Sequence, residues 1–171
     1  INSIEKITVY SPIITYIVAI YLLLCTKYEF SNHMIILLLL SGVTNTILKE
    51  LICKPLMKDK IYPIIGRGTR PNNIESSISY IKNSYGMPSA HSQNISVFSI
   101  FLIYFIMKSS LKKNEKKILI FTLMTFVLIV MYGRVYLSKV HTNQQVIVGY
   151  IIGYLVFMIY YKSVEYKSIK M

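Results

Sequence analysis

The chain is a series of five long apolar runs separated by polar turns. A helix that crosses the hydrocarbon core of a bilayer needs ~20 residues, and the runs approach this length. They lie roughly at residues 7–25, 33–52, 89–107, 118–132 and 144–161. Pro12 falls near the start of the first run, where a helix tolerates proline. The pattern predicts an all-α integral membrane bundle of about five transmembrane helices, built as a single domain over residues 1–171.

Composition supports a membrane protein rather than a soluble one. Hydrophobic residues make up 54% of the 171 residues, and the formal net charge is +12. In a soluble chain this charge would suggest nucleic acid, but no RNA-reading motif is present. Because the apolar runs indicate a membrane protein, we expect the basic residues to set its orientation in the membrane or to bind anionic head groups or an anionic substrate. We therefore expect membrane lipids as partners and no nucleic acid. The oligomeric state is not predicted. Two unpaired thiols are favoured for Cys25 and Cys53, with a disulfide left open.

Residues 53–88 form the one long polar connection. It holds four prolines, three glycines and six Lys or Arg residues. Loops of this length without secondary structure are usually either functional or disordered. The apolar stretches 61–65 and 74–81 favour an ordered cap on the membrane surface, and a disordered basic loop is the alternative.

The turn 108–117 sets the predicted orientation, because it carries five Lys and one Glu. Basic residues in short loops favour the cytosolic side. We therefore expect this turn and the C-terminus in the cytosol. If all five runs span, the long loop and the polar ends of its flanking runs lie on the lumenal or outer face.

Polar residues from three distant parts of the chain gather at that face. They are Lys49, Arg67, Arg70, Ser89, His91, Arg134 and His141. Each alone has an ordinary explanation, since Lys and Arg at span ends often extend to the head groups. Together, two histidines with fixed cations make a poor divalent-metal site. They suit a phosphoryl group, whose oxygens the cations would hold while one histidine attacks and the other protonates the leaving oxygen. We expect no metal and no cofactor.

The stretch Pro88-Ser89-Ala90-His91 leads directly into an apolar run. The start of a helix presents unpaired backbone N–H groups and the positive end of the helix dipole. It is therefore a ready anion site. Ser89 and the backbone N–H groups of Ala90 and His91 are predicted to form a phosphate cradle.

These residues resemble the motifs of the type-2 phosphatidic acid phosphatase superfamily. Pro88-Ser89-Ala90-His91 resembles its Pro-Ser-Gly-His motif, and Arg134…His141…Gln145 resembles its Ser-Arg-x5-His-x3-Asp motif. Lys49 with Arg70-Pro71 resembles Lys-x6-Arg-Pro. Gln145 in place of the third-motif Asp is similar to the dolichyl-diphosphatase branch. The resemblance covers residues 45–153. It implies metal-independent hydrolysis of a lipid phosphate, above all a polyprenyl diphosphate, on the lumenal side of the endoplasmic reticulum.

The chain departs from the family pattern at several positions. Six residues separate Arg134 from His141 where the family has five, and Gly133 stands in place of the family Ser. Ala90 replaces Gly. Counting six residues from Lys49 leads to Leu56-Met57 rather than Arg-Pro. We interpret this as a loop insertion that recruits Arg70 from its far end.

The resemblance also implies a role for each matching residue. His141 would be the nucleophile that forms a phosphohistidine, and Gln145, four residues later on the same helix face, would orient its ring. His91 would be the general acid. The remaining residues would hold the phosphate: Arg134, Lys49, Arg70, Ser89, Ala90 and, as a weaker candidate, Arg67. A lipid phosphotransferase on the same scaffold and a catalytically degenerate membrane scaffold or lipid binder are the alternatives.

Overall fold

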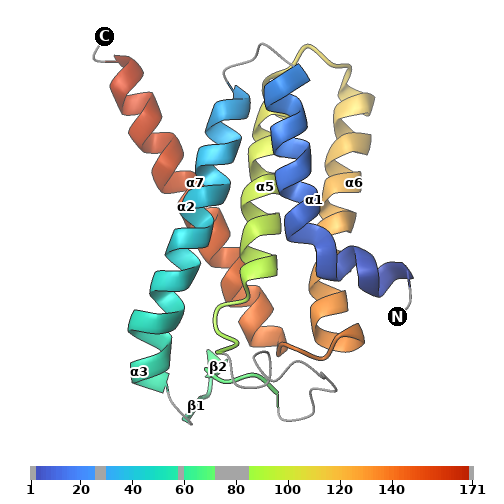
Figure 1. Cartoon of the computed structure of the whole chain (residues 1–171). Coiled ribbons are helices and arrows are strands. Elements are labelled where there is room, and N and C mark those ends of the chain that lie inside the picture. The colour runs from blue at the N-terminus through green and yellow to red at the C-terminus, as the bar shows by residue number, and fades with distance from the viewer. Residues whose placement is uncertain (1–2, 26–29, 58–59, 72–84, 170–171) are drawn as a thin grey trace.

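The protein is a bundle of long helices with a small hairpin at one end (Figure 1). The computed structural model describes residues 3–25, 30–57, 60–71 and 85–169. The long helices are α1 (Ser3–Cys25), α2 (Phe30–Ile47), α5 (Ala90–Lys108), α6 (Lys113–Tyr132) and α7 (Asn143–Ile169). Within the described ranges, five helical segments are long and apolar enough to cross a membrane. This confirms the predicted all-α membrane bundle.

Two of the helices continue through π-helical turns. After α2 the chain runs through η1 (Leu48–Cys53) into the short α3 (Lys54–Met57), and α6 runs into η2 (Gly133–Leu137). In η2 the N–H of Ser138 donates to the carbonyl of Gly133 over 2.8 Å. A π-turn closes its hydrogen bonds five residues apart, holds one residue more than an α-turn, and occurs frequently at functional sites. One of these turns carries Lys49 and the other Arg134.

Helix α5 lies at the centre and packs against α1, α2, α6 and α7. The core consists of buried apolar side chains from all five long helices: Ala19, Met34, Leu37, Leu38, Ile95, Val97, Phe98, Phe101, Val127, Val130 and Phe157. Many large apolar side chains on the other helices are exposed. A surface of this kind is expected where a helix faces lipid rather than water.

A buried polar network joins α2 to α5. Ser41 Oγ donates to Asn94 Oδ1 over 2.8 Å, and Asn45 Nδ2 donates to Gln93 Oε1 over 2.8 Å. Gln93 Nε2 then donates to the carbonyl of Ser41 over 2.7 Å. Hydrogen bonds between helices help to hold membrane bundles together, because lipid offers no competing partners.

Two glycines allow α7 to approach the start of α5 closely. A Cβ atom at Gly149 would lie 2.5 Å from the carbonyl oxygen of Ser89, and one at Gly153 would lie 2.4 Å from that of Gln93. Any larger residue at either position would push the helices apart. The contact holds the first turn of α5 against α7, which begins just after His141.

The described part of the long connection is folded. Strands β1 (Ile61–Tyr62) and β2 (Gly66–Arg67) form an antiparallel hairpin, with Gly66 at a φ of 84°. The N–H of Gly86 then donates to the carbonyl of Gly68 over 2.8 Å, which ties the end of the connection to its hairpin. The predicted apolar stretch 74–81 lies outside the described residues. The ordered-cap prediction therefore describes residues 60–71 correctly.

The elements that carry the predicted polar residues meet at one end of the bundle. The hairpin, the start of α5, η2 and the start of α7 lie together at the bottom of Figure 1. The turn between α5 and α6 and the C-terminal end of α7 lie at the opposite end. The Lys-rich turn is thus separated from these elements by the length of the bundle.

Candidate active site

His141 is held by a side chain of its own helix. Its Nδ1 atom lies 3.1 Å from Gln145 Oε1, and the ring is 3% exposed. An amide oxygen only accepts, so the proton lies on Nδ1 and the lone pair on Nε2. Burial holds the pKa of His141 well below its usual range, and the charges of Arg70 and Arg134 lower it further. The ring is therefore neutral at pH 7, which is the form that can attack phosphorus.

Gln145 also joins α7 to strand β2 and the residues that follow it. Its Nε2 atom donates to the carbonyls of Arg67 (2.9 Å) and Thr69 (2.7 Å). Gly86 makes room for this arrangement, because a Cβ there would lie 2.5 Å from Gln145 Oε1. A carboxylate could accept from His141 but could not donate to the two carbonyls. The loop thus gives a physical reason for Gln at this position.

Arg70 lies shortly after strand β2 and contacts His141 from there. Its Nη1 atom donates to the carbonyl of Val140 over 3.0 Å and lies 3.2 Å from His141 Nε2. The guanidinium therefore faces the lone pair of the ring. Arg67 lies one step further from the histidine and donates through Nη1 to the carbonyl of Arg70 over 3.3 Å. The structure places Arg70, rather than Arg67, on His141.

Arg134 is almost fully buried beside the same histidine. Its side chain is 7% exposed, and its Nε atom has no hydrogen-bond partner among the described residues. Its carbonyl accepts the N–H groups of both Val140 and His141 over 3.2 Å. A buried charged donor without a partner is costly, so this guanidinium is arranged for an acceptor that binds from outside.

Lys49 completes a group of three cations. The charges of Arg70 and Arg134 both act on its ammonium group. The one ion pair among the described residues is the exposed pair between Lys54 and Glu50, at 2.9 Å. The like charges of these three side chains repel one another, and an anion bound between them would relieve the repulsion. Within the described residues, no three His, Cys, Asp or Glu side chains come together.

The residues of the predicted cradle lie at the start of α5. Ser89 is the N-cap, and its Oγ atom accepts the N–H of Ser92. The N–H of Ser89 donates to the carbonyl of Gln145 over 3.1 Å, so it is already bonded within the protein. Ala90 and His91 are the first residues of the helix, where N–H groups lack helical acceptors. Asn45 Nδ2 lies 3.4 Å from the carbonyl of Pro88, so the buried network reaches this loop.

His91 is joined to the cation group and to the first helix. The charges of Arg134, Lys49 and Arg70 all act on its ring. Its Nε2 atom lies 3.0 Å from the carbonyl of Val9 in α1. This partner could not be predicted, because a backbone carbonyl in an apolar run leaves no signature in the sequence.

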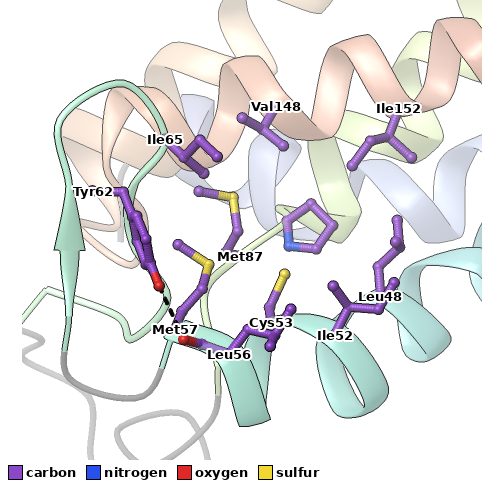
Figure 2. Close-up of a pocket in the computed structure, with 11 residues that line it drawn as sticks. Leu48, Ile52, Cys53, Leu56, Met57, Tyr62, Ile65, Met87, Val148 and Ile152 are labelled. Carbon is purple, nitrogen blue, oxygen red and sulfur yellow. Dashed lines mark hydrogen bonds between the residues drawn. The ribbon is translucent and has the colours of Figure 1, made fainter.

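An apolar pocket of about 350 Å³ lies at the same end of the bundle as the cation group. It lies between η1, α3, the hairpin and α7, as Figure 2 shows. Its lining is apolar apart from the Cys53 thiol, which is free, and the Tyr62 hydroxyl, which donates to the carbonyl of Leu56 over 3.1 Å. Leu48 and Pro88 line the pocket directly beside Lys49 and Ser89 in the chain.

Fold and site together define an all-α membrane protein with a buried cluster of histidines and cations suited to an anion. Residues 30–169 match the PAP2 superfamily, so the chain belongs to this superfamily. A similar protein is Dolichyldiphosphatase 1 of Dictyostelium discoideum, which is 37% identical over 89 residues. That match covers 50% of this chain and 38% of the relative, so the chain spans well under half of it. No solved structure gives a significant match.

Proposed function

We propose that the chain is a lipid phosphatase that hydrolyses a polyprenyl diphosphate. The observation that carries the proposal is the buried Arg134, whose Nε lacks a partner among the described residues, next to His141. The PAP2 membership and the relative named Dolichyldiphosphatase 1 support the reaction class. The apolar pocket at the same end of the bundle supports a substrate with a hydrocarbon chain.

The proposed reaction starts at His141. An arriving phosphate accepts the Arg70 N–H that otherwise faces Nε2, and this frees the ring lone pair. Nε2 then forms a bond to phosphorus while the bond to the leaving oxygen breaks, and that oxygen takes a proton from His91. Gln145 Oε1 keeps the Nδ1 proton in place during attack. Arg134, Arg70 and Lys49 hold the negative oxygens.

The second half of the reaction releases phosphate. Water gives a proton to His91 and attacks phosphorus, and the bond between Nε2 and phosphorus breaks. The histidine returns to its neutral form and inorganic phosphate leaves. The phosphohistidine route, the absence of a metal and the roles of Ser89 and Ala90 as cradle residues belong to this proposal. So does the location, with the site on the lumenal face of the endoplasmic reticulum and the C-terminus in the cytosol.

Phosphate release from a polyprenyl diphosphate by the full chain in detergent, in the presence of EDTA, tests the proposal. We expect His141→Ala and His91→Ala to abolish release. The matched control is His33→Ala, because His33 lies 2.6 Å from the Tyr160 hydroxyl in a separate contact. Activity that survives His141→Ala would contradict the nucleophile, and loss of activity in EDTA would contradict the metal-free mechanism.

A further inference from the structure

The first helix is bent at a proline. Pro12 lies in the interior of α1, where it has no N–H to donate to the carbonyl of Thr8. Ser11 Oγ donates to that carbonyl instead, over 3.0 Å. Figure 1 shows the N-terminal part of α1 turned away from the axis of the rest of the helix. The sequence suggested that this proline is tolerated near a helix start, but the helix begins nine residues earlier, at Ser3.

The bent part of α1 contacts two elements of the candidate site. The carbonyl of Val9 lies 3.0 Å from His91 Nε2. The side chain of Thr8 occupies the space beside Gly133, where a Cβ would lie 2.2 Å from Thr8 Cγ2. Gly133 directly precedes Arg134. Both contacts come from residues before position 30, where the superfamily match begins.

The contact with Val9 determines the proton position on His91. A carbonyl oxygen only accepts, so the ring must carry a proton on Nε2 to make this bond. That leaves Nδ1 as the nitrogen available to a substrate. Gln145 has the corresponding role for His141, where it holds the proton on Nδ1 and leaves the Nε2 lone pair facing Arg70. Each histidine therefore has one nitrogen whose proton is fixed by the protein.

We propose that α1 is the positioning element of the general acid: its Pro12 bend presents the Val9 carbonyl to His91, which fixes the ring and directs Nδ1 to the leaving oxygen. The role of His91 rests on the proposed function. In the acid form both ring nitrogens carry protons. The Nδ1 proton passes to the leaving oxygen and is replaced from the attacking water, while the Nε2 proton stays on the ring and is donated to the Val9 carbonyl throughout.

Two measurements test this inference. In nitrogen NMR of histidine-labelled wild-type protein, recorded at a pH where the His91 ring is neutral, the His91 signal, assigned by its loss in His91→Gln, should show the tautomer protonated at Nε2. Pro12→Ala restores an N–H at this turn and should straighten α1. Turnover of an alkyl phosphate, a poor leaving group that needs an acid, should then fall by about 10²-fold. Turnover of 4-nitrophenyl phosphate, which needs little acid, should fall far less.

Tyr16→Phe is the matched control, because Tyr16 lies in α1 beyond the bend and its hydroxyl donates to the carbonyl of Leu38 in α2 over 3.1 Å. It should leave the ratio of the two substrates unchanged. A neutral His91 protonated at Nδ1 would overturn the inference without any turnover measurement. An equal loss on both substrates in Pro12→Ala would also overturn it. A wild-type protein that turns over neither phosphate ester nor diphosphate would instead contradict the proposed function.

Discussion

The backbone of Arg134 holds the backbone of His141 directly: the carbonyl of the arginine accepts the N–H of the histidine over 3.2 Å. The two residues are separated by one residue more than in the family pattern. The extra length is taken up in η2, a π-helical turn, followed by Lys139 at a φ of 50°. The extra residue therefore does not separate Arg134 from His141, and both belong to the same candidate site.

Gln145→Glu is expected to impair the protein although the two side chains have the same shape. A carboxylate cannot donate to the carbonyls of Arg67 and Thr69, and it would be buried, since Gln145 is 0% exposed. Leaving a buried acceptor unpaired costs ~1–3 kcal/mol. We expect a lower midpoint of thermal unfolding in detergent and a lower kcat. Gln144→Glu, one residue earlier and exposed, should change neither. A fully active Gln145→Glu protein would refute the joining role of this amide.

The pH dependence of His141 follows from its surroundings. Its pKa lies below the usual value of about 6.5 in the folded chain, whereas the unfolded chain keeps that value. The unfolded chain therefore takes up the proton first as the pH falls, so the stability from this group is present above pH ~6.5 and declines below it. Arg70→Gln removes one cause of the lowered pKa. The NMR titration midpoint of His141 should move to higher pH.

Lys139→Gln is the control for this titration. Lys139 is exposed and two residues from His141, so solvent screens its charge. Its removal should leave the midpoint almost unchanged. If Arg70→Gln leaves the titration midpoint of His141 unchanged, the guanidinium does not face the ring in solution.

The resemblance to the family motifs predicted which residues would form the candidate site. Arg70 could be assigned because an Arg-Pro pair follows a lysine at a span end, even though a hairpin separates them. The hairpin itself explains the distance, since residues 60–71 fold back so that Arg70 Nη1 reaches His141. The five spans follow directly from hydropathy.

Other features have no pattern in the sequence. The contribution of α1 is a backbone carbonyl and a small side chain against Gly133, and neither forms a motif. The π-turns at Lys49 and Arg134 were not predicted from the sequence. The reason for Gln145 is tertiary, because its amide donates to the carbonyls of Arg67 and Thr69, which are distant in the sequence.

The apolar pocket yields a prediction about chain length. Ile152 lines the pocket from α7, and Ile151 beside it is 49% exposed on the outside of the helix. Ile152→Phe should fill part of the space in which we propose that the hydrocarbon lies. KM for a polyprenyl phosphate should rise about tenfold, which corresponds to ~1.4 kcal/mol. KM for a short alkyl phosphate should be unchanged. In Ile151→Phe, KM should be unchanged for both the polyprenyl phosphate and the short alkyl phosphate. Equal effects of the two variants would place the hydrocarbon elsewhere.

Gly133→Ser, which restores the family residue, is expected to harm this chain. A Cβ at position 133 would lie 2.2 Å from Thr8 Cγ2, 2.6 Å from Oγ1 and 2.7 Å from Cβ. The serine would displace α1, η2 or both, and with them Val9 and Arg134. We expect a lower unfolding midpoint and lower phosphate release. Gly42→Ser in α2 should be tolerated, because the nearest atom to its Cβ would be the Tyr16 hydroxyl at 3.8 Å.

Smaller residues at Thr8, the partner of Gly133 in this contact, should rescue Gly133→Ser in steps. In Gly133→Ser, Thr8→Ala removes Cγ2 and Oγ1 but leaves the Cβ that would lie 2.7 Å away, so recovery should be partial. Thr8→Gly removes all three atoms and should restore more activity. Its free energy of unfolding should still be lowered by the ~1 kcal/mol that glycine costs inside a helix. Unfolding midpoints and kcat of the four proteins in each double-mutant cycle would measure the coupling. If Thr8→Gly lowers activity equally with Gly or Ser at position 133, the two residues are not in contact in the working protein.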